Sequence, residues 1–271
     1  NNLEKLIRML RDAFANKSKS AEEVSKPKYR LPEGKNPDYK GDVWVYAEQE
    51  AEGINPASFE LLGKAVELAG VLNEKVGAVL VGKEIKGLAG ELIAYGANKV
   101  FTAEHKLLEN FLPVPYTRVV SELIEKYKPQ MMLFSATPLG RELAPRVAYR
   151  LNSGLTADCT GLDIVDFKRG EREHTAILMQ TRPALGGNIM ASIITQNSIL
   201  QMSTARPGVL QALKPDYRRT GELYEYIPNI IKADLGAIIT SVEVFPLTFE
   251  LKEARIIVSG GGGCKTKEGF N

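Results

Sequence analysis

The sequence of 271 residues is poor in the residue types that build metal and disulfide sites. It has only two cysteines, two histidines and one tryptophan. These are too few for an iron–sulfur cluster or a structural zinc site at the usual ligand spacings, so we expect no metal in this stretch. Cys159 and Cys264 lie far apart in the sequence, and so small a number favours a reduced pair over a disulfide.

Long apolar runs and an excess of one charge are also missing. No apolar segment reaches the roughly 18 residues that span a bilayer, and the first residues lack the pattern of a signal peptide. The 35 basic and 33 acidic residues nearly balance, so charge gives no reason to expect nucleic acid or an anionic membrane as partner. We therefore expect a cytoplasmic protein. The chain begins at Asn1 rather than Met and ends soon after a glycine run, which indicates a fragment.

The apolar pattern indicates strands that alternate with helices. The expected strands are 43–47, 78–81, 99–102 and 131–135, and the expected helices are 59–72, 85–94, 117–127 and 139–151. Ser58 suits the cap of the first helix. This alternation predicts right-handed βαβ units and an α/β fold with a doubly wound, mostly parallel sheet, Rossmann-like or adenine-nucleotide-hydrolase-like. Ligands of such sheets bind beyond the carboxyl ends of the strands, so the loops after Ala47, Val81, Thr102 and Ser135 are expected to carry function.

The rest of the chain has a weaker pattern. Residues 3–14 predict a short helix, and the polar, proline-containing stretch 17–40 indicates an extended arm or an unstructured terminus. Short β-rich segments at 156–165, 174–180, 189–194 and 201–205 are expected to extend the sheet at one edge, and 214–234 reads as a charged connector.

Further strands are expected at 237–249 and 254–258, and the second of them runs into the glycines at 260–263. A strand that feeds a glycine-rich turn is typical of the start of a nucleotide-binding domain. The prediction is therefore an arm at 1–40, an α/β domain with a β-rich edge at 41–235, and a linking strand with the start of a second α/β domain at 236–271.

The densest candidate site is the segment SATPLGRELAPR at residues 135–146. Thr137 can cap a helix whose first residue is Pro138. The amino end of that helix then lies at a strand's carboxyl end, where its free N–H groups favour an anion. Leu139, Leu143, Val147 and Leu151 share a face that should be core, whereas Arg146 does not lie on it. Pro145 is expected to bend the helix.

Arg146 has two interpretations. It could be directed at a ligand beside the bend, or it could pair with a surface carboxylate, which is the commoner situation for a helix arginine. Arg182, in the segment QTRPALGGN at 180–188, stands before a proline and a double glycine that permits close approach of a partner. It could equally lie in a plain loop between strands.

Five segments resemble, in order and spacing, the alpha subunit of electron-transfer flavoproteins. They are DVWVYAEQ at 42–49, IKGLAGELIAYG at 85–96, GRELAPRVAYRLNSGLTADCTGL at 140–162, QTRPALGGN at 180–188 and MSTARPG at 202–208. The resemblance extends over residues 40–271. The TADCT and RPA segments within it are closer to the branch of anaerobes that performs flavin-based electron bifurcation than to the respiratory branch.

The resemblance implies an electron-transfer subunit without independent turnover. The first domain of the alpha subunit pairs with a beta subunit, and its second domain holds an FAD that shuttles electrons. In bifurcating members a second FAD, in the beta subunit, faces the first domain of alpha and divides the electrons of NADH between ferredoxin and the alpha FAD. The final acceptor or donor is a flavin-dependent dehydrogenase of acyl-CoA or lactate type. An iron–sulfur cluster is implied only if a ferredoxin-like module precedes the chain.

The resemblance also assigns residues. Arg146 matches the family arginine near the N5 and carbonyl edge of the beta-subunit flavin, where a fixed cation favours the anionic reduced form, and this match favours the ligand-directed interpretation. Arg141, Thr137 and Arg182 are further candidates for that flavin. Candidates for the alpha FAD are Ser259, Gly260, Gly261 and Gly262. Gly262 stands where the family has an arginine against the FAD ring, which puts that contact in doubt.

Two alternatives stay open. One is a non-bifurcating electron-transfer flavoprotein with AMP in its beta subunit. The other is a regulatory module of the same fold that binds ATP or AMP and transfers no electrons, because a fold does not fix a function. The second alternative predicts a phosphate-binding glycine loop within residues 80–140, where Gly82 and Gly140 stand as isolated glycines.

Overall fold

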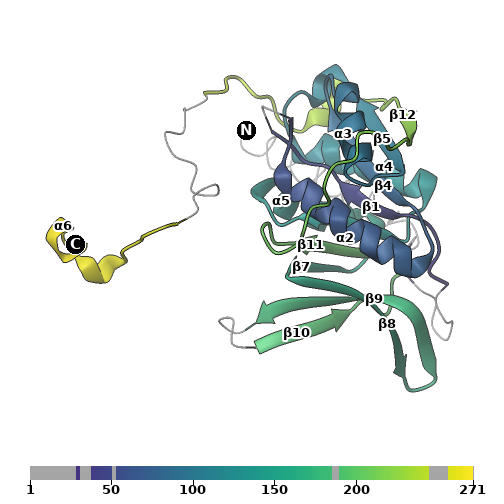
Figure 1. The fold of residues 1–271 in the computed structure, drawn as a ribbon. Helices are drawn as coiled ribbons and strands as arrows, with labels where there is room; N and C mark the ends of the chain where they lie inside the picture. The colour runs from purple at the N-terminus through teal and green to yellow at the C-terminus, as the bar shows by residue number, and fades with distance from the viewer. Residues whose placement is uncertain (1–28, 31–37, 51–52, 185–188, 244–255, 271) are drawn as a thin grey trace, which may run out of the picture. The chain divides into compact units, whose positions relative to one another are not determined.

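A parallel sheet of seven strands forms the centre of the larger of two units into which the chain divides, residues 1–236 and 237–271. The computed structural model describes residues 29–30, 38–50, 53–184, 189–243 and 256–270 (Figure 1). The strands are β1 (Val43–Tyr46), β4 (Val76–Gly82), β5 (Lys99–Glu104), β6 (Met131–Ser135), β7 (Leu155–Cys159), β11 (Gln201–Ala205) and β12 (Glu222–Tyr226). Their order is β12-β5-β4-β1-β6-β11-β7, and every neighbouring pair is parallel.

Helices cover both faces of the sheet, as the alternating pattern predicted. They are α2 (Pro56–Leu72), α3 (Ala89–Ala94), α4 (Pro113–Tyr127) and α5 (Pro138–Leu151), with 3-10 turns at Lys86–Leu88, Lys106–Leu108 and Lys232–Leu235. α2 and α3 pack on one face of the sheet, and α4 and α5 pack on the other. Since both faces are covered, β1, β4 and β6 are buried along their whole length. The doubly wound α/β fold is confirmed.

The expected cap at Ser58 is wrong. α2 begins three residues earlier than predicted, at Pro56, because the Asn55 side chain accepts a hydrogen bond from the Ala57 N–H at 2.9 Å. Ser58 is fully buried inside the helix, and its hydroxyl accepts a hydrogen bond from the Glu48 N–H at 2.9 Å. Asparagine is as good a cap as serine, and a proline directly after it fixes the first turn.

The β-rich stretch after α5 divides between two sheets, so the prediction that it extends one edge is correct only in part. β7 and β11 do extend the parallel sheet beyond β6. β8 (Gly161–Arg169), β9 (Arg172–Ala184) and β10 (Ile189–Ile194) instead form a separate antiparallel sheet in the order β10-β9-β8. β8 and β9 are joined by a tight turn at Gly170, and strands so closely linked can only pair antiparallel.

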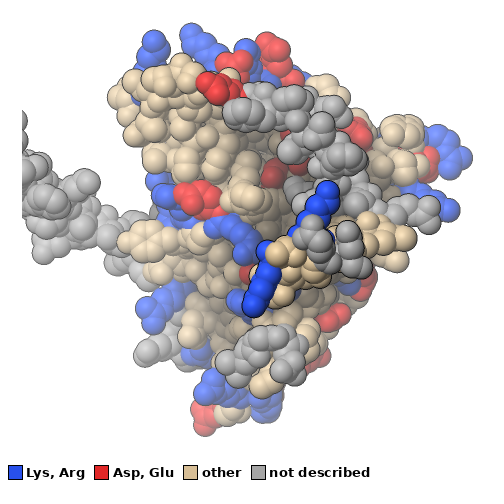
Figure 2. All heavy atoms as spheres, turned by 90° about the vertical axis from the view of Figure 1, so that its left-hand side faces the viewer, with Lys and Arg blue, Asp and Glu red and all other residues tan. Residues whose placement is uncertain are grey.

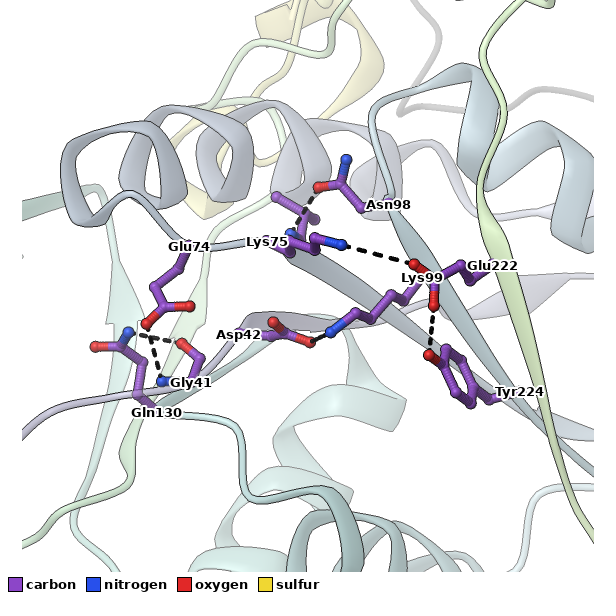
Figure 3. A network of polar contacts seen from close by, with 10 residues as sticks. Gly41, Asp42, Glu74, Lys75, Asn98, Lys99, Gln130, Glu222 and Tyr224 are labelled. Atoms are coloured by element: carbon purple, nitrogen blue, oxygen red, sulfur yellow. Dashed lines mark hydrogen bonds and ion pairs between the residues drawn. The ribbon is translucent and has the colours of Figure 1, made fainter.

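The charged connector predicted at 214–234 contains an edge strand, β12, which pairs in parallel with β5. Its side chains are exposed or half-buried, so it lacks the apolar run that marked the inner strands. Figure 3 shows how its first residue joins a polar network at the amino ends of the strands, where Lys75 Nζ lies 3.6 Å from Glu222 and Lys99 Nζ lies 2.7 Å from Asp42. Of these two pairs, the one between Lys75 and Glu222 joins the edge strand to the residue before β4.

The predicted strands of the second unit are not found among its described residues. Residues 237–243 and 256–258 have no regular structure, because a strand needs a pairing partner and no described segment of that unit supplies one. The unit has a 3-10 turn at Gly262–Cys264 and a short helix, α6 (Lys267–Phe270). The predicted helix at 3–14 lies outside the described residues. Of the predicted arm, Tyr29 bonds to the body of the unit, where its carbonyl accepts the N–H of Ile199 at 2.9 Å.

Candidate functional site

The carboxyl ends of β1, β6, β11 and β7 lie side by side at one edge of the sheet, because these strands are parallel neighbours. The chain runs from β1 outward through β4 and β5, and then returns to place β6 on the other side of β1. The point between β1 and β6 is therefore the topological switch point, where α/β folds bind their ligands. The segments that follow these four strands are the candidate site.

A buried hydrogen-bond chain closes the switch point. The Thr137 hydroxyl donates to Glu48 Oε2 at 2.5 Å and accepts the Gly140 N–H at 3.1 Å, so Thr137 caps α5 as predicted. Thr137 and Glu48 are both buried. Gly140 is required here, because a Cβ would come within 1.9 Å of the Ser135 carbonyl oxygen. The chain fixes the first turn of α5 against the end of β6, and direct contact of Thr137 with a cofactor stays a prediction.

The outer side of α5 presents two arginines. Arg141 and Arg146 are about half exposed, at 54% and 50% of their side-chain surface. Arg146 pairs with Glu142 one turn earlier, with Arg146 Nε and a terminal nitrogen each 2.6 Å from the same carboxylate oxygen. The helix face opposite is core, since Leu143, Val147 and Leu151 are fully buried. Pro145 lies inside the helix as predicted.

Arg146 thus makes the surface ion pair that the plainer interpretation expected, while its guanidinium stays open to solvent on one side. An exposed pair of this kind is weak, and it leaves the arginine available to a ligand brought by another subunit. The assignment of Arg146 to a flavin stays a prediction. Figure 2 shows one face of the molecule, where Lys and Arg side chains are scattered together with Asp and Glu side chains over a largely uncharged surface.

Arg141 spans the ends of two strands. Arg141 Nε donates to the Ala136 carbonyl, after β6, at 2.8 Å, and a terminal nitrogen lies 2.9 Å from Asp158 Oδ1, in β7. Beside it is a hollow of about 250 Å³ whose lining includes Arg141, Pro145, Asp158 and Thr204. Asp158 and Thr204 were not among the predicted site residues. A carboxylate in the segment TADCT was the only available signal.

Arg182 lies on β9 of the antiparallel sheet rather than in a loop, opposite Ala191 of β10. Burial raises the pKa of the Cys159 thiol to about 11, and the charge of Arg182 acts in the opposite direction. The N–H of Thr160, directly after β7, donates to the carbonyl of Thr181 at 2.8 Å, so the neighbouring Arg182 is close to the end of β7. The double glycine at 186–187 lies outside the described residues.

The candidates for the alpha FAD all lie in the second unit. Ser259 to Gly261 have no regular structure, and Gly262 begins the 3-10 turn. Gly260 is packed against the Phe270 ring, since a Cβ there would come within 2.3 Å of it. A Cβ on Gly261 or Gly262 would meet no described atom within 4 Å, so their backbone is open to a ligand. These assignments stay predictions.

Metal-binding groups and membrane-spanning helices are both absent from the part of the chain that the structure describes. No group of three or more His, Cys, Asp or Glu side chains is arranged to hold a metal ion there. None of its helices combines the length and the apolar character that crossing a membrane requires. Cys159 is a buried free thiol, and Cys264 is a free thiol of intermediate exposure.

The α/β fold and its site at the carboxyl edge define a ligand- or partner-binding platform of the doubly wound class. The sequence pattern of the electron transfer flavoprotein domain matches residues 43–229, which is more than half of the chain. The chain belongs to the electron transfer flavoprotein family. Its relatives show that, within this family, it resembles alpha subunits.

Three relatives illustrate the similarity. The electron transfer flavoprotein subunit alpha of Thermoanaerobacterium thermosaccharolyticum is 42% identical over 235 residues, which cover 86% of this chain and 68% of that protein. The subunit alpha of Megasphaera elsdenii is 42% identical over 236 residues, covering 86% and 67%. LctC, a subunit of the lactate dehydrogenase (NAD(+),ferredoxin) of Acetobacterium woodii, is 41% identical over 232 residues, covering 85% and 53%.

Proposed function

We propose that this chain is the alpha subunit of a bifurcating electron-transfer flavoprotein. It passes electrons between an NADH-reduced flavin, ferredoxin and a flavin-dependent dehydrogenase of acyl-CoA or lactate type. The observation that carries the proposal is the pair of half-exposed arginines, Arg141 and Arg146, on the outer side of α5 beside the switch point. The name of the relative LctC, which includes both NAD(+) and ferredoxin, supports it.

The residues of the carboxyl edge fit the edge of a flavin brought by a beta subunit. An FAD there would supply reversible two-electron chemistry. Arg141 and Arg146 are permanently charged and present planar donors, which suit the carbonyl oxygens of such a ring. A fixed cation beside the ring stabilises added negative charge and so shifts the flavin's potential upward. The buried chain of Glu48, Thr137 and Gly140 holds the helix that carries both arginines.

Cofactor analysis of the purified complex tests the proposal. The full-length chain is expressed with its beta subunit, FAD and AMP are counted in the complex, and NADH-driven reduction of ferredoxin is measured in the presence of the dehydrogenase acceptor. Two FAD per heterodimer together with ferredoxin reduction are expected. One FAD with one AMP and no ferredoxin reduction would contradict bifurcation and identify a simple carrier. Bound adenylate without any flavin would instead identify the regulatory module.

A further inference from the structure

The segment TADCT at the end of β7 interrupts the parallel ladder between β7 and β11. Thr156 pairs with Ser203 and Cys159 pairs with Ala205, so that two residues of β7, Ala157 and Asp158, stand opposite the single residue Thr204. This arrangement is a β-bulge, a feature that redirects a side chain at the cost of local pairing.

At the bulge, Asp158 has an unusual backbone conformation. Its φ is +61°, in the left-handed region that L-residues other than glycine, asparagine and aspartate rarely adopt. Its N–H, which the bulge takes out of the ladder, donates to the hydroxyl of Thr204 at 2.9 Å. Thr204 is itself buried. The side chain opposite the bulge therefore replaces the lost backbone partner and stabilises the conformation of Asp158.

The redirected carboxylate meets Arg141. Asp158 Oδ1 lies 2.9 Å from a terminal nitrogen of Arg141, and the Asp158 side chain is only 17% exposed. Arg141 Nε is bound to the Ala136 carbonyl at 2.8 Å. The guanidinium is thus held at two points, from β6 and from β7. Arg141 also lines the hollow, together with Pro145, Ala157 and Thr204.

We propose that Asp158 is a positioning residue that fixes Arg141 for an oxygen-rich ligand at this hollow, and that the bulge opposite Thr204 is what brings its carboxylate there. This rests on the proposed function, which gives the ligand as the carbonyl edge of the beta-subunit flavin. An arginine restrained by a carbonyl and a carboxylate has less rotamer freedom to lose, so binding costs less than it would for a mobile side chain. Its orientation also directs its free N–H donors at one place.

Two variants of Asp158 separate the effect of its carboxylate from the effect of its backbone conformation. Asp158→Asn keeps the size and the tolerance of a left-handed φ, and Asp158→Gly keeps the backbone conformation with no side chain. Either can fold if the other does not. Asp163→Asn is the matched control, because Asp163 is an exposed aspartate on the neighbouring β8. Each is made in the full-length heterodimer, in the wild-type background and together with Arg141→Ala.

Two measurements are made on each variant. Hydrogen exchange of the Arg141 Nε–H by ¹⁵N NMR reports whether the guanidinium is held, independently of any flavin. The rate of NADH oxidation and the midpoint potential of the beta-subunit flavin report whether the held arginine acts on it. We expect Asp158→Asn and Asp158→Gly to accelerate exchange, to slow NADH oxidation roughly three- to tenfold and to change the midpoint potential. Neither variant should have a further effect in the Arg141→Ala background, and Asp163→Asn should have none.

Unchanged exchange at Arg141, or equal effects of the Asp158 variants with and without Arg141, would overturn the positioning role. Faster exchange with no change in oxidation rate or potential, for both the Asp158 and the Arg141 variants, has a different meaning. Asp158 would then position Arg141 as proposed, and the placing of the flavin at this edge would be wrong.

Discussion

Arg146 and Arg150 stand one turn apart on α5, and both are exposed. Their roles should differ, because the proposed function assigns Arg146, and not Arg150, to the beta-subunit flavin. Arg146→Ala is expected to slow NADH oxidation in the heterodimer by at least about tenfold, since it removes a fixed charge from the reduced flavin. Heterodimer assembly and thermal stability should hardly change, because the pair with Glu142 is half exposed. Stopped-flow flavin reduction measures the effect.

Arg150→Ala is the control for that experiment, and it should react as the wild type does. If the Arg146→Ala variant reduces the flavin as fast as the wild type does, Arg146 forms only a surface ion pair.

Gly140 and Gly90 are both helical glycines with opposite surroundings. A methyl group on Gly140 would come within 1.9 Å of the Ser135 carbonyl, whereas Gly90 is exposed on α3 and has nothing within 4 Å among the described atoms. Gly140→Ala is expected to lower the free energy of unfolding by about 1–3 kcal/mol through overpacking. Gly90→Ala should raise it by about 0.5–1 kcal/mol through helix propensity. Urea titration of both variants measures these changes. An unchanged free energy of unfolding in Gly140→Ala would contradict the close contact of residue 140 with the Ser135 carbonyl.

The two thiols should differ in reactivity. Cys159 is fully buried, and its pKa is raised to about 11 mainly by that burial, whereas Cys264 is partly exposed. A thiol reagent at pH 8 should therefore label one cysteine in the native protein and two after unfolding. Since the neutral thiol is the favoured form, its contribution to stability is complete below the unfolded pKa of about 8.5 and is lost as the pH rises toward 11. Rapid labelling of native Cys159 would contradict this.

At the scale of elements, Figure 3 shows two ion pairs at the amino ends of the strands: Asp42, before β1, pairs with Lys99 of β5, and Lys75, before β4, pairs with Glu222 of β12. Lys99 and Asp42 are the half-buried members, with 21% and 16% of their side chains exposed. Lys99→Met keeps the aliphatic stem and removes the charge, so it should cost about 1–2 kcal/mol of unfolding free energy. The same change at Lys86, whose pair with Glu225 is exposed, should have little effect. Chemical denaturation of both variants tests the contrast.

At the scale of the whole molecule, the division at Gly236 separates a unit with two apolar cores from a unit whose described residues are mostly exposed. Cooperative unfolding of the first unit should therefore not depend on the second. A chain ending at residue 236 is expected to keep the thermal midpoint of the 271-residue chain within about 2 °C. Calorimetry of the two chains measures this, and a clearly lower midpoint would mean that residues 237–271 stabilise the platform.

The sequence by itself determined the inner architecture of this protein. β1, β4 and β6 are buried on both faces, so their apolar runs are unmistakable, and α5 carries its own start signals in Thr137 and Pro138. The family resemblance rested on five ordered segments, and the domain match and the relatives confirmed it.

Only the tertiary structure decided what depends on contacts between distant segments. β12 is an edge strand with little apolar character. β8 and β9 resemble β7 in composition, but they pair with each other in the antiparallel sheet whereas β7 pairs with β11 in the parallel sheet. The buried link between Glu48 and Thr137 joins residues 89 positions apart in the sequence. The two contacts of Arg141 likewise depend on distant segments. One is with the Ala136 carbonyl after β6, and the other is with Asp158, whose position depends on the bulge in β7 and the Thr204 hydroxyl of β11. No local sequence pattern predicts such contacts, because they depend on the order of the strands in the sheet.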